Sequence, residues 1–529
     1  MAGENGRKAV LADYMDYATV HGIGRSKNSP YLVFKLFWVL ALLASLGMII
    51  WQVRDLYVKY DSHPVSTSIE VKTAKRLKFP PITICNTNPA QYSLVEPGST
   101  LDDVIQEASK KYSIDLNIYN STDMYNYNFS AFDEQNKNSS LENDIMWITA
   151  EQFRMKMATL DDFTLENISQ PLPEFFLLCN FAGKPGATSS GAQFLIEKIL
   201  HTASLCYREA ITQIRSYTYG LCYKFEPEYI PELSPHGEVA DAGPKYSLEI
   251  LLNVDQSESI PFVTSSAGVV IGSDSRSQIF HENNGVFVPT GFETNIALSL
   301  VDTERVTGYD KTPRCDQSND FESSLLDCFK SCKLRDIVNS CGCYLHFFNI
   351  GSINKSVSLN NTFDDLFGYS PCYTKQHYKC IQELEATYIL QPTDDCDECL
   401  PPCSEIYYES HVSQSTWPGT NFIPILRKIF NSKLKDQMAS SEVNRDYVRD
   451  NLALVRIYLS SLSYQVIKEE YAYSEVDFIS DIGGQLGLWA GFSVLSLCEI
   501  LELIFLLCAS GMKRENTNPD NTVTPLEKK

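Results

Sequence analysis

Two long apolar segments lie near the ends of the chain, and a longer mixed segment separates them. The first apolar segment covers residues 31–51 and carries one charge, Lys35, near its start. In a helix that rises about 1.5 Å per residue, such a segment spans roughly the 30 Å hydrocarbon layer of a bilayer. The second covers residues 479–509. The pattern predicts membrane helices over residues 31–53 and 475–509.

The segment between the spans alternates between strand-like and helix-like spacing of its apolar residues. Alternation with a period of two predicts strands at residues 68–86, 246–254, 267–273, 284–301 and 451–473. Helical spacing predicts helices over residues 101–111, 194–215, 321–340 and 420–440. We therefore expect an α+β domain over residues 54–474, with a sheet whose strands come from both ends of the segment.

The charge balance limits the classes of partner. The chain has 44 Lys+Arg against 66 Asp+Glu, a net charge of -22, and this excess of acid argues against a nucleic-acid partner, which needs a basic face. Arg25, Lys27, Lys513 and Arg514 flank the two spans. Basic residues accumulate beside spans on the cytoplasmic side, so we expect both termini in the cytosol.

Cysteines and glycosylation sequons support the same topology. Fourteen of the 16 cysteines lie between the spans, and disulfides form outside the reducing cytosol. All six Asn-x-Ser/Thr sequons lie there too, at Asn120, Asn128, Asn138, Asn167, Asn354 and Asn360. These features predict that residues 54–474 lie outside the cell and that the tails, 1–30 and 510–529, lie inside. Cys498 and Cys508 in the second span are interpreted as small apolar residues or acylation sites.

The second span contains acidic residues and glycines on one side of a helix. Within an arc of roughly 80° at 100° per residue lie Asp481, Gly484, Leu488, Gly491, Leu495, Glu499 and Glu502. Glycines spaced by four are common where helices pack closely. Carboxylates that face lipid are costly, so this side should face water or partner chains. Several copies around one axis would form a cation pathway.

Ser493 does not fit a straight helix that lines such a pathway. It falls nearly opposite the acidic side. Ser493 can therefore line the same pathway only if the helix breaks near Gly491, which a glycine permits.

An ordered set of motifs resembles the degenerin/epithelial sodium channel superfamily, which includes the acid-sensing and FMRFamide-gated channels. The motifs are HG at 21–22, FPPITICN at 79–86, YGLCYKF at 219–225, CFKSCKLRDIVNSCGCYLHFF at 328–348, CDECLPPCSEIYYESHVSQSTWP at 396–418 and DIGGQLGLWAGFSVLSLCEILEL at 481–503. The resemblance implies a homotrimer with six transmembrane helices. Each chain would have a palm sheet, a finger at about 92–215, a thumb at about 315–403, a knuckle and a β-ball.

The resemblance also implies seven disulfides and a set of pore residues. The disulfides would be Cys85–Cys222, Cys179–Cys206, Cys315–Cys403, Cys328–Cys399, Cys332–Cys396, Cys341–Cys380 and Cys343–Cys372. The pore residues would be a selectivity filter of Gly491, Phe492 and Ser493, a gate of Ser480, Asp481, Gly484 and Leu488, and a lower pore of His21, Gly22, Glu499 and Glu502. Phe492 replaces the usual Ala or Ser. If the backbone lines the filter, this side chain matters less for selectivity and could pack between subunits.

The sequence indicates less about the stimulus that opens the channel than about the residues of its pore. Protease activation needs basic cleavage sites in the finger, and the finger has no Arg-x-x-Arg. The acid-sensing branch has two histidines where this chain has Pro64 and Val65, just after His63, and a tryptophan where it has Thr312. These departures weaken the proton-gating hypothesis. The long finger and the GGQLGLW segment resemble FMRFamide-gated channels most closely.

An RFamide peptide would need carboxylates beside aromatic rings. The finger offers both in Asp123, Tyr125, Tyr127, Phe129, Phe132 and Asp133. We therefore expect a peptide-gated, amiloride-sensitive, sodium-selective channel of the plasma membrane, which is not an enzyme and needs no metal or cofactor beyond permeant Na⁺. The alternatives are a proton-gated or constitutive channel of the same superfamily, an ATP-gated two-span trimer and a two-span scavenger-type receptor without a pore.

Overall fold

The computed structural model of the chain divides into two compact units. One comprises Met1–Ser68 together with Glu469–Lys529, and the other comprises Ile69–Lys468. The structure describes residues 10–11, 13–16, 19, 22–112, 116, 142–181, 210–229, 237–273, 285–309, 312–316, 325–344, 370–390, 396, 399–426 and 445–512.

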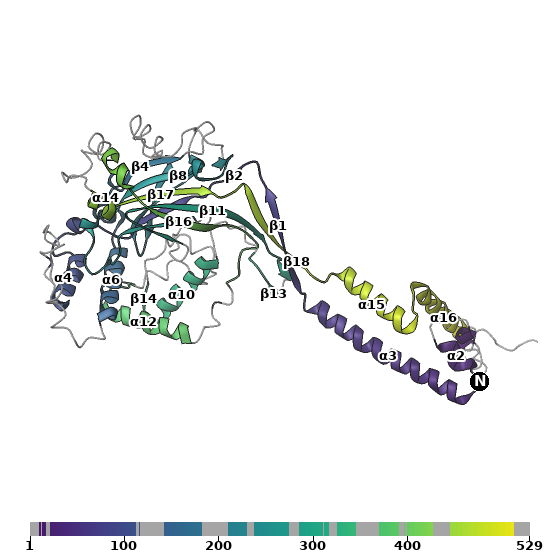
Figure 1. The fold of residues 1–529 in the computed structure, drawn as a ribbon. Coiled ribbons are helices and arrows are strands. Elements are labelled where there is room, and N and C mark those ends of the chain that lie inside the picture. Colours follow the sequence, from purple (N-terminus) through teal and green to yellow (C-terminus); the bar gives the residue numbers. More distant parts are fainter. Residues whose placement is uncertain are drawn as a thin grey trace, which may run out of the picture. The chain divides into compact units, whose positions relative to one another are not determined.

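A seven-stranded sheet forms the centre of the larger unit (Figure 1). Its order is β1-β18-β11-β17-β8-β4, and β16 also pairs with β11. The strands are β1 (Val65–Thr73), β4 (Phe176–Phe181), β8 (Leu248–Asn253), β11 (Phe292–Glu304), β16 (Ser404–Thr416), β17 (Leu452–Leu459) and β18 (Ser463–Tyr471). β11 pairs with β16 along its whole length, with β17 over residues 293–298 and with β18 over residues 301–304. One strand therefore joins three others.

A five-stranded antiparallel sheet, of order β10-β9-β3-β6-β5, packs with the first. Its strands are β3 (Ile82–Asn86), β5 (Ile211–Ser216), β6 (Gly220–Phe225), β9 (Gly268–Gly272) and β10 (Val286–Pro289). Every residue of β3, β9 and β8 is buried, which explains why these strands are almost continuously apolar. A single buried cluster combines side chains of both sheets, including Ile84, Val269 and Ile250.

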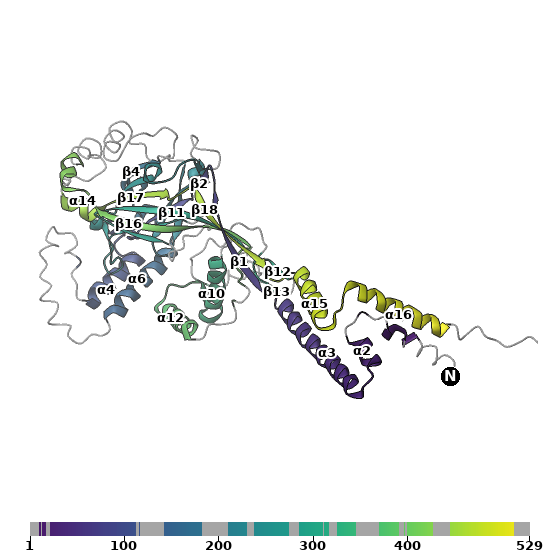
Figure 2. The same cartoon turned by 45° about the vertical axis from the view of Figure 1, so that its right-hand side comes forward.

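Helices pack in pairs beside the sheets (Figure 2). α4 (Thr100–Tyr112) contacts α6 (Glu142–Ala158) through a cluster that contains Ile105 and Phe153. α10 (Leu325–Cys341) contacts α12 (Lys375–Leu390) through a cluster that contains Ile337 and Ile381. The shorter elements are α7 (Asp162–Ile168), α8 (Leu172–Phe175) and α14 (Arg445–Asn451), and the small sheets β2 (Leu77–Lys78) with β7 (Glu238–Val239), β12 (Gly308–Tyr309) with β13 (Thr312–Pro313) and β14 (Cys343–Tyr344) with β15 (Ser370–Pro371).

Six disulfides connect the described cysteines, in the pairs that the family resemblance implies. They are Cys85–Cys222, Cys315–Cys403, Cys328–Cys399, Cys332–Cys396, Cys341–Cys380 and Cys343–Cys372. The last five are nested, because each encloses the next along the chain. Cys179 is also disulfide-bonded, and its expected partner Cys206 lies outside the described residues. Nested crosslinks reduce the entropy of the unfolded chain and so stabilise this region.

One predicted helix is wrong where the structure describes it. The helix expected over residues 194–215 is replaced, from Ile211 onward, by strand β5, and residues 194–209 lie outside the described residues. β5 pairs with β6 across a short turn that ends at Gly220, whose φ is 68°. The β-branched residues Ile211, Thr212 and Ile214 favour a strand. Their spacing also fits a helix, so periodicity did not separate the two.

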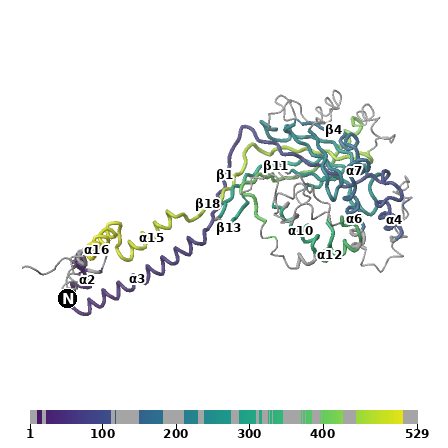
Figure 3. The backbone as a smooth tube through the Cα atoms, turned by 180° about the vertical axis from the view of Figure 1, so that it is seen from behind, coloured from purple at the N-terminus to yellow at the C-terminus, as the bar shows by residue number. Residues whose placement is uncertain are grey.

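The smaller unit contains four described helices of six or more residues: α2 (Ile23–Asn28), α3 (Leu32–Asp61), α15 (Glu475–Ala490) and α16 (Val494–Met512). α3 is long and apolar enough to cross a membrane. α15 and α16 meet the same criterion only as a pair, and they are bent by 76° at a short break. α15 runs beside α3 (Figure 3). The described residues therefore contain one continuous candidate span and one broken candidate span.

A largely buried group of charges crosses three strands of the seven-stranded sheet. Arg456 on β17 lies directly opposite Glu249 on β8, and its Nη2 is 3.5 Å from Glu249 Oε1. Its Nη1 also donates to Glu293 on β11. The side chains are only 19, 8 and 21 % exposed, respectively. One guanidinium thus serves as the counter-charge of two carboxylates inside the sheet, which leaves the group with a formal charge of -1.

We predict that Arg456→Met destabilises the protein by about 3–5 kcal/mol, because it leaves two buried carboxylates without a counter-charge. Thermal unfolding of the detergent-solubilised protein measures the effect. Arg449→Met is the matched control. Arg449 is itself 58 % exposed in its ion pairs with Asp446 and Asp450, and the loss of such solvent-screened pairs should cost at most about 1 kcal/mol. Equal melting temperatures for the two variants would contradict the assigned role of Arg456.

Candidate functional site

The break between α15 and α16 is the main feature of the second apolar segment. α15 ends at Ala490 and α16 begins at Val494. Gly491 has φ 64° and ψ 26°, in the left-handed region that side chains with a Cβ rarely adopt. The amides of Gly491 and Phe492 still donate to the carbonyls of Gly487 and Leu486, at 2.9 and 3.2 Å. The helix therefore ends in an ordered turn, at the position where a pathway lined by Ser493 would require a break.

Two serines begin the second helix after the break. The amide of Ser496 donates to Ser493 Oγ at 3.3 Å, and the amide of Ser493 donates to Ser496 Oγ at 3.1 Å. This reciprocal pattern corresponds to a capping box, in which two side chains satisfy the free amides of a helix start. Ser496 is fully buried. The sequence S-x-x-S directly after a helix-ending glycine therefore explains why the chain bends instead of continuing.

Part of the N-terminal segment contacts one of these serines, Ser496, and the nearby Glu499. Thr19 Oγ1 is 2.8 Å from Ser496 Oγ, and both Thr19 Oγ1 and the Thr19 amide donate to Glu499 Oε2 at 3.1 Å. Nearby, burial raises the pKa of Tyr14, and the Glu499 carboxylate adds to this. Gly22 precedes α2 with φ 89°. His21 lies outside the described residues, and the described residue of this segment that contacts Glu499 is Thr19.

The four predicted gate residues all lie on α15. Ser480, Asp481, Gly484 and Leu488 are exposed in the single chain, and Leu488 is 76 % exposed. Asp481 accepts a hydrogen bond of 2.8 Å from the Tyr473 hydroxyl. Burial, followed by this bond to Asp481, raises the pKa of Tyr473 to about 12, so its hydroxyl remains a donor at neutral pH. An exposed apolar and acidic helix face is suited to water or to another copy of the chain.

Polar and aromatic contacts join α3 to α15 at both ends of α15. Near the break, Trp489 Nε1 donates to Gln52 Oε1 at 2.7 Å. At the other end, the ring of Tyr60 stacks on Phe478, with centroids 4.8 Å apart. These contacts fix α15 against α3 within the unit. α16 begins only after the break, so these contacts with α3 do not set the direction of its axis.

Glu499 and Glu502 lie on α16, on the far side of the break from Asp481. Because the axis bends by 76° between them, the single acidic stripe expected on a straight helix does not continue through the segment. The structure therefore separates the acidic residues into one group on α15 and another on α16.

Several other predicted site residues lie outside the described residues. They are the proposed ligand residues Asp123, Tyr125, Tyr127, Phe129, Phe132 and Asp133, and the sequons Asn120, Asn128, Asn138, Asn354 and Asn360. Asn167 is described and lies exposed on α7. It is therefore sterically open to a glycan.

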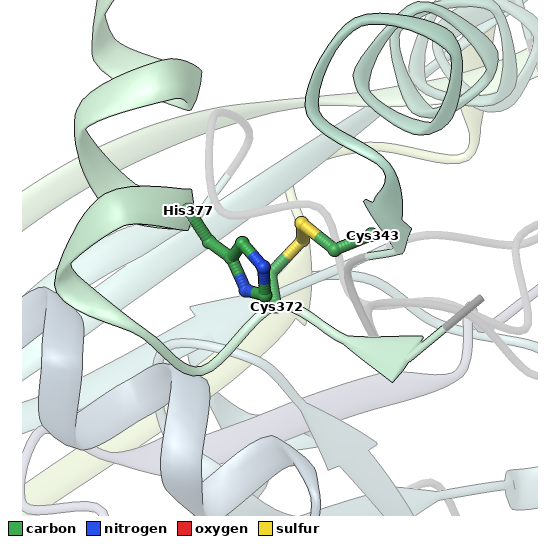
Figure 4. A group of neighbouring side chains, drawn as sticks. All are labelled: Cys343, Cys372 and His377. Atoms are coloured by element: carbon green, nitrogen blue, oxygen red, sulfur yellow. A yellow bond between two sulfur atoms is a disulfide. The ribbon is translucent and has the colours of Figure 1, made fainter.

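One group of side chains has the composition of a metal site but not its chemistry. Cys343, Cys372 and His377 offer ligand atoms within 4.8 Å of one another. Figure 4 shows the two sulfur atoms joined in a disulfide, with an S–S distance of 2.05 Å. Metal-binding cysteines act as thiolates, and a disulfide cannot supply them. His377 Nδ1 instead accepts from the Tyr373 amide at 3.3 Å, so we interpret this group as structural.

Comparison with known proteins assigns the chain to a family. The sequence model of the amiloride-sensitive sodium channel family matches residues 14–503. The chain belongs to this family. The degenerin-like protein asic-2 of Caenorhabditis elegans is 26% identical over 95% of this chain and 88% of its own length. The human bile acid-sensitive ion channel is 24% identical over 94% and 86%, and the Xenopus laevis epithelial sodium channel subunit beta-2 is 25% identical over 94% and 83%.

Membership of the amiloride-sensitive sodium channel family makes the chain a membrane channel subunit with a disulfide-rich extracellular domain. The family implies a location in the plasma membrane and Na⁺ as the permeant ion. Its relatives are ion channels and not enzymes. The comparisons do not distinguish the FMRFamide-gated branch from the others.

Sequence reasoning missed four residues that the structure places at the site. Ser496 was detectable, because S-x-x-S at a helix start is a capping signal. Thr19, Tyr473 and Gln52 were not, because their contacts depend on how distant segments pack. Thr19, for example, bonds to a residue 480 positions away.

We predict that Gly491→Ala reduces sodium selectivity. Alanine would pay about 1 kcal/mol to adopt the left-handed backbone, so the break would distort or the helix would continue through it. If the whole of this strain is relieved by displacement of the filter, the Na⁺/K⁺ permeability ratio falls by up to about fivefold, which reversal potentials measure. Gly483→Ala is the control, since an added Cβ there meets nothing within 4 Å. Unchanged selectivity in Gly491→Ala would show that the break does not form the filter.

Proposed function

We propose that the chain forms a homotrimeric, sodium-selective channel of the plasma membrane, with α3 and the α15–α16 pair as its two spans and both termini in the cytosol. The observation that supports this most strongly is the break at Gly491 in an apolar segment that carries Asp481 on one side and Glu499 on the other. A helix that only anchored the chain in lipid would gain nothing from either feature.

The proposed filter uses the backbone that the break frees. Residues 491–493 lie between the helices. The Ser493 carbonyl accepts from the Leu497 amide at 3.3 Å, so we propose that the carbonyls of Gly491 and Phe492 point toward a shared axis. Three copies would form a ring of oxygens that replaces part of the hydration shell of Na⁺. Asp481 would concentrate cations at the outer mouth, and Glu499 and Glu502 at the inner mouth. The exposed face of α15 would then line the axis and contact its symmetry mates.

We propose an FMRFamide-type peptide as the stimulus and amiloride as a blocker. The peptide hypothesis depends on the acidic and aromatic residues of the finger, which can bind an arginine and two phenylalanine rings. Peptide binding would move the finger against the thumb, and the palm strands would transmit the movement to the gate between Asp481 and Leu488. β11 suits this role, because it pairs with three other strands of the sheet.

The sequence leaves protons as an alternative stimulus that could open the channel. The human, mouse and rat relatives are bile acid-sensitive channels, so bile acids are a third stimulus to compare. All three hypotheses share the same pore.

We predict that oocytes that express the chain give an inward Na⁺ current on application of FMRFamide and that amiloride blocks it. Two-electrode voltage clamp measures the current, with acid and a bile acid applied to the same cells. A current evoked by acid or bile acid, with no response to peptide, would retain the channel and exclude peptide gating.

A second experiment tests the pore without depending on any stimulus. Ser480→Cys, treated with a bulky thiol reagent, should hold the gate open, because the added group lies beside Asp481 on the exposed face of α15. Surface biotinylation confirms that the protein reaches the membrane. Surface protein that passes no current under any stimulus, with or without the thiol reagent, would contradict the channel assignment.

A further inference from the structure

The start of α15 contains a contact between the proposed gate and the chain just before it. Tyr473 follows the end of β18 and precedes Ser474, the N-cap of α15. Its hydroxyl donates to Oδ2 of Asp481 at 2.8 Å. Asp481 is eight residues further on, about two helical turns into α15. The side chain of Tyr473 must therefore lie along the first turns of the helix to reach it.

Neighbouring contacts fix Tyr473 in this position. Ser474 Oγ accepts from the Asp477 amide at 3.2 Å, and Asp477 Oδ2 accepts from the Ser474 amide at 2.9 Å, which forms a capping box. From α3, Lys59 Nζ lies 4.1 Å from the centroid of the Tyr473 ring, at a distance typical of a cation–π contact. The ring is buried at 6 % exposure. The helix start and α3 thus hold the phenol from two sides.

Among the residues that the structure describes, the Asp481 carboxylate has a hydrogen-bond partner at only one of its two oxygens, Oδ2, which accepts from Tyr473. The residue itself is exposed. A carboxylate can bind a divalent cation through one or both oxygens, and the phenol competes with the cation for one of them.

We propose that Tyr473 is a positioning residue for the outer carboxylate, and that its hydroxyl limits how tightly the mouth of the pore binds divalent cations. The inference rests on the proposed function, because it needs Asp481 at the outer end of a cation pathway. In a trimer, three phenols would restrain three carboxylates. The mouth would then attract Na⁺ without retaining Ca²⁺, which would otherwise block the pathway.

The test is block of the Na⁺ current by extracellular Ca²⁺ in Tyr473→Phe, which keeps the ring and removes only the donor. The half-blocking Ca²⁺ concentration should fall by about tenfold, the factor expected when a hydrogen bond to a charged group no longer competes with the cation. Tyr471→Phe is the matched control. It removes a hydroxyl two residues away, from a ring that packs near His63 and not at Asp481, and Ca²⁺ block should not change.

A double-mutant cycle separates this role from a general structural one. Asp481→Asn should weaken Ca²⁺ block, and the addition of Tyr473→Phe to it should have no further effect, because the bonded carboxylate is already gone. If Tyr473→Phe does not reach the surface, 4-methoxyphenylalanine at position 473 removes the donor while keeping the ring and the oxygen.

Currents are recorded both with FMRFamide and from Ser480→Cys channels opened by an uncharged thiol reagent. No current under either condition would contradict the proposed function itself. Currents with the same Ca²⁺ sensitivity in Tyr473→Phe and the unmodified chain would overturn the role of Tyr473 alone. An equal shift in the presence and absence of Asp481 would also overturn it.

Discussion

The left-handed glycine at position 491 is the constraint on which the organisation of the second span depends. It ends α15 in a turn whose amides remain bonded, and the Ser493–Ser496 capping box begins α16 in a new direction. Without the break, one continuous stripe would carry all the acidic residues, and Ser493 would face away from it. With the break, Asp481 and Glu499 belong to different helices. The N-terminal segment contacts the second of these helices through Thr19.

Each proposed span is adjacent in the sequence to a strand of the seven-stranded sheet. α3 leads into β1, β18 leads through Tyr473 into α15, and β1 and β18 are neighbours in one sheet. β11 links β18 to β16 and β17. The buried Arg456 group links β17 to β8 and β11, and the nested disulfides restrain residues 315–403.

Local sequence patterns predicted the features that depend on burial or on steric limits. The apolar runs of β8 and β9, the helices α4 and α10, and the break at Gly491 all followed from periodicity or from the misfit of Ser493. Periodicity indicates whether a residue is buried, but it does not identify the residues or strands that it contacts. The three partners of β11, the pairing of Arg456 with two glutamates and the bond from Tyr473 to Asp481 therefore could not be derived from the sequence. β5 shows the same limit, since its isoleucines fit either period and the pairing with β6 decides.

The most direct test of the broken pore helix is a cysteine-accessibility scan over residues 481–502, in a background where Cys498 and Cys508 are replaced by alanine. Water-soluble thiol reagents would be applied to open channels and the change in current recorded at each position. The account predicts reactive positions every three to four residues down to Leu488, reactivity at Ser493 across the break, and a second series that includes Glu499 and Glu502. A single uninterrupted helical stripe that passes through Gly491 and Leu495 and leaves Ser493 unreactive would contradict it.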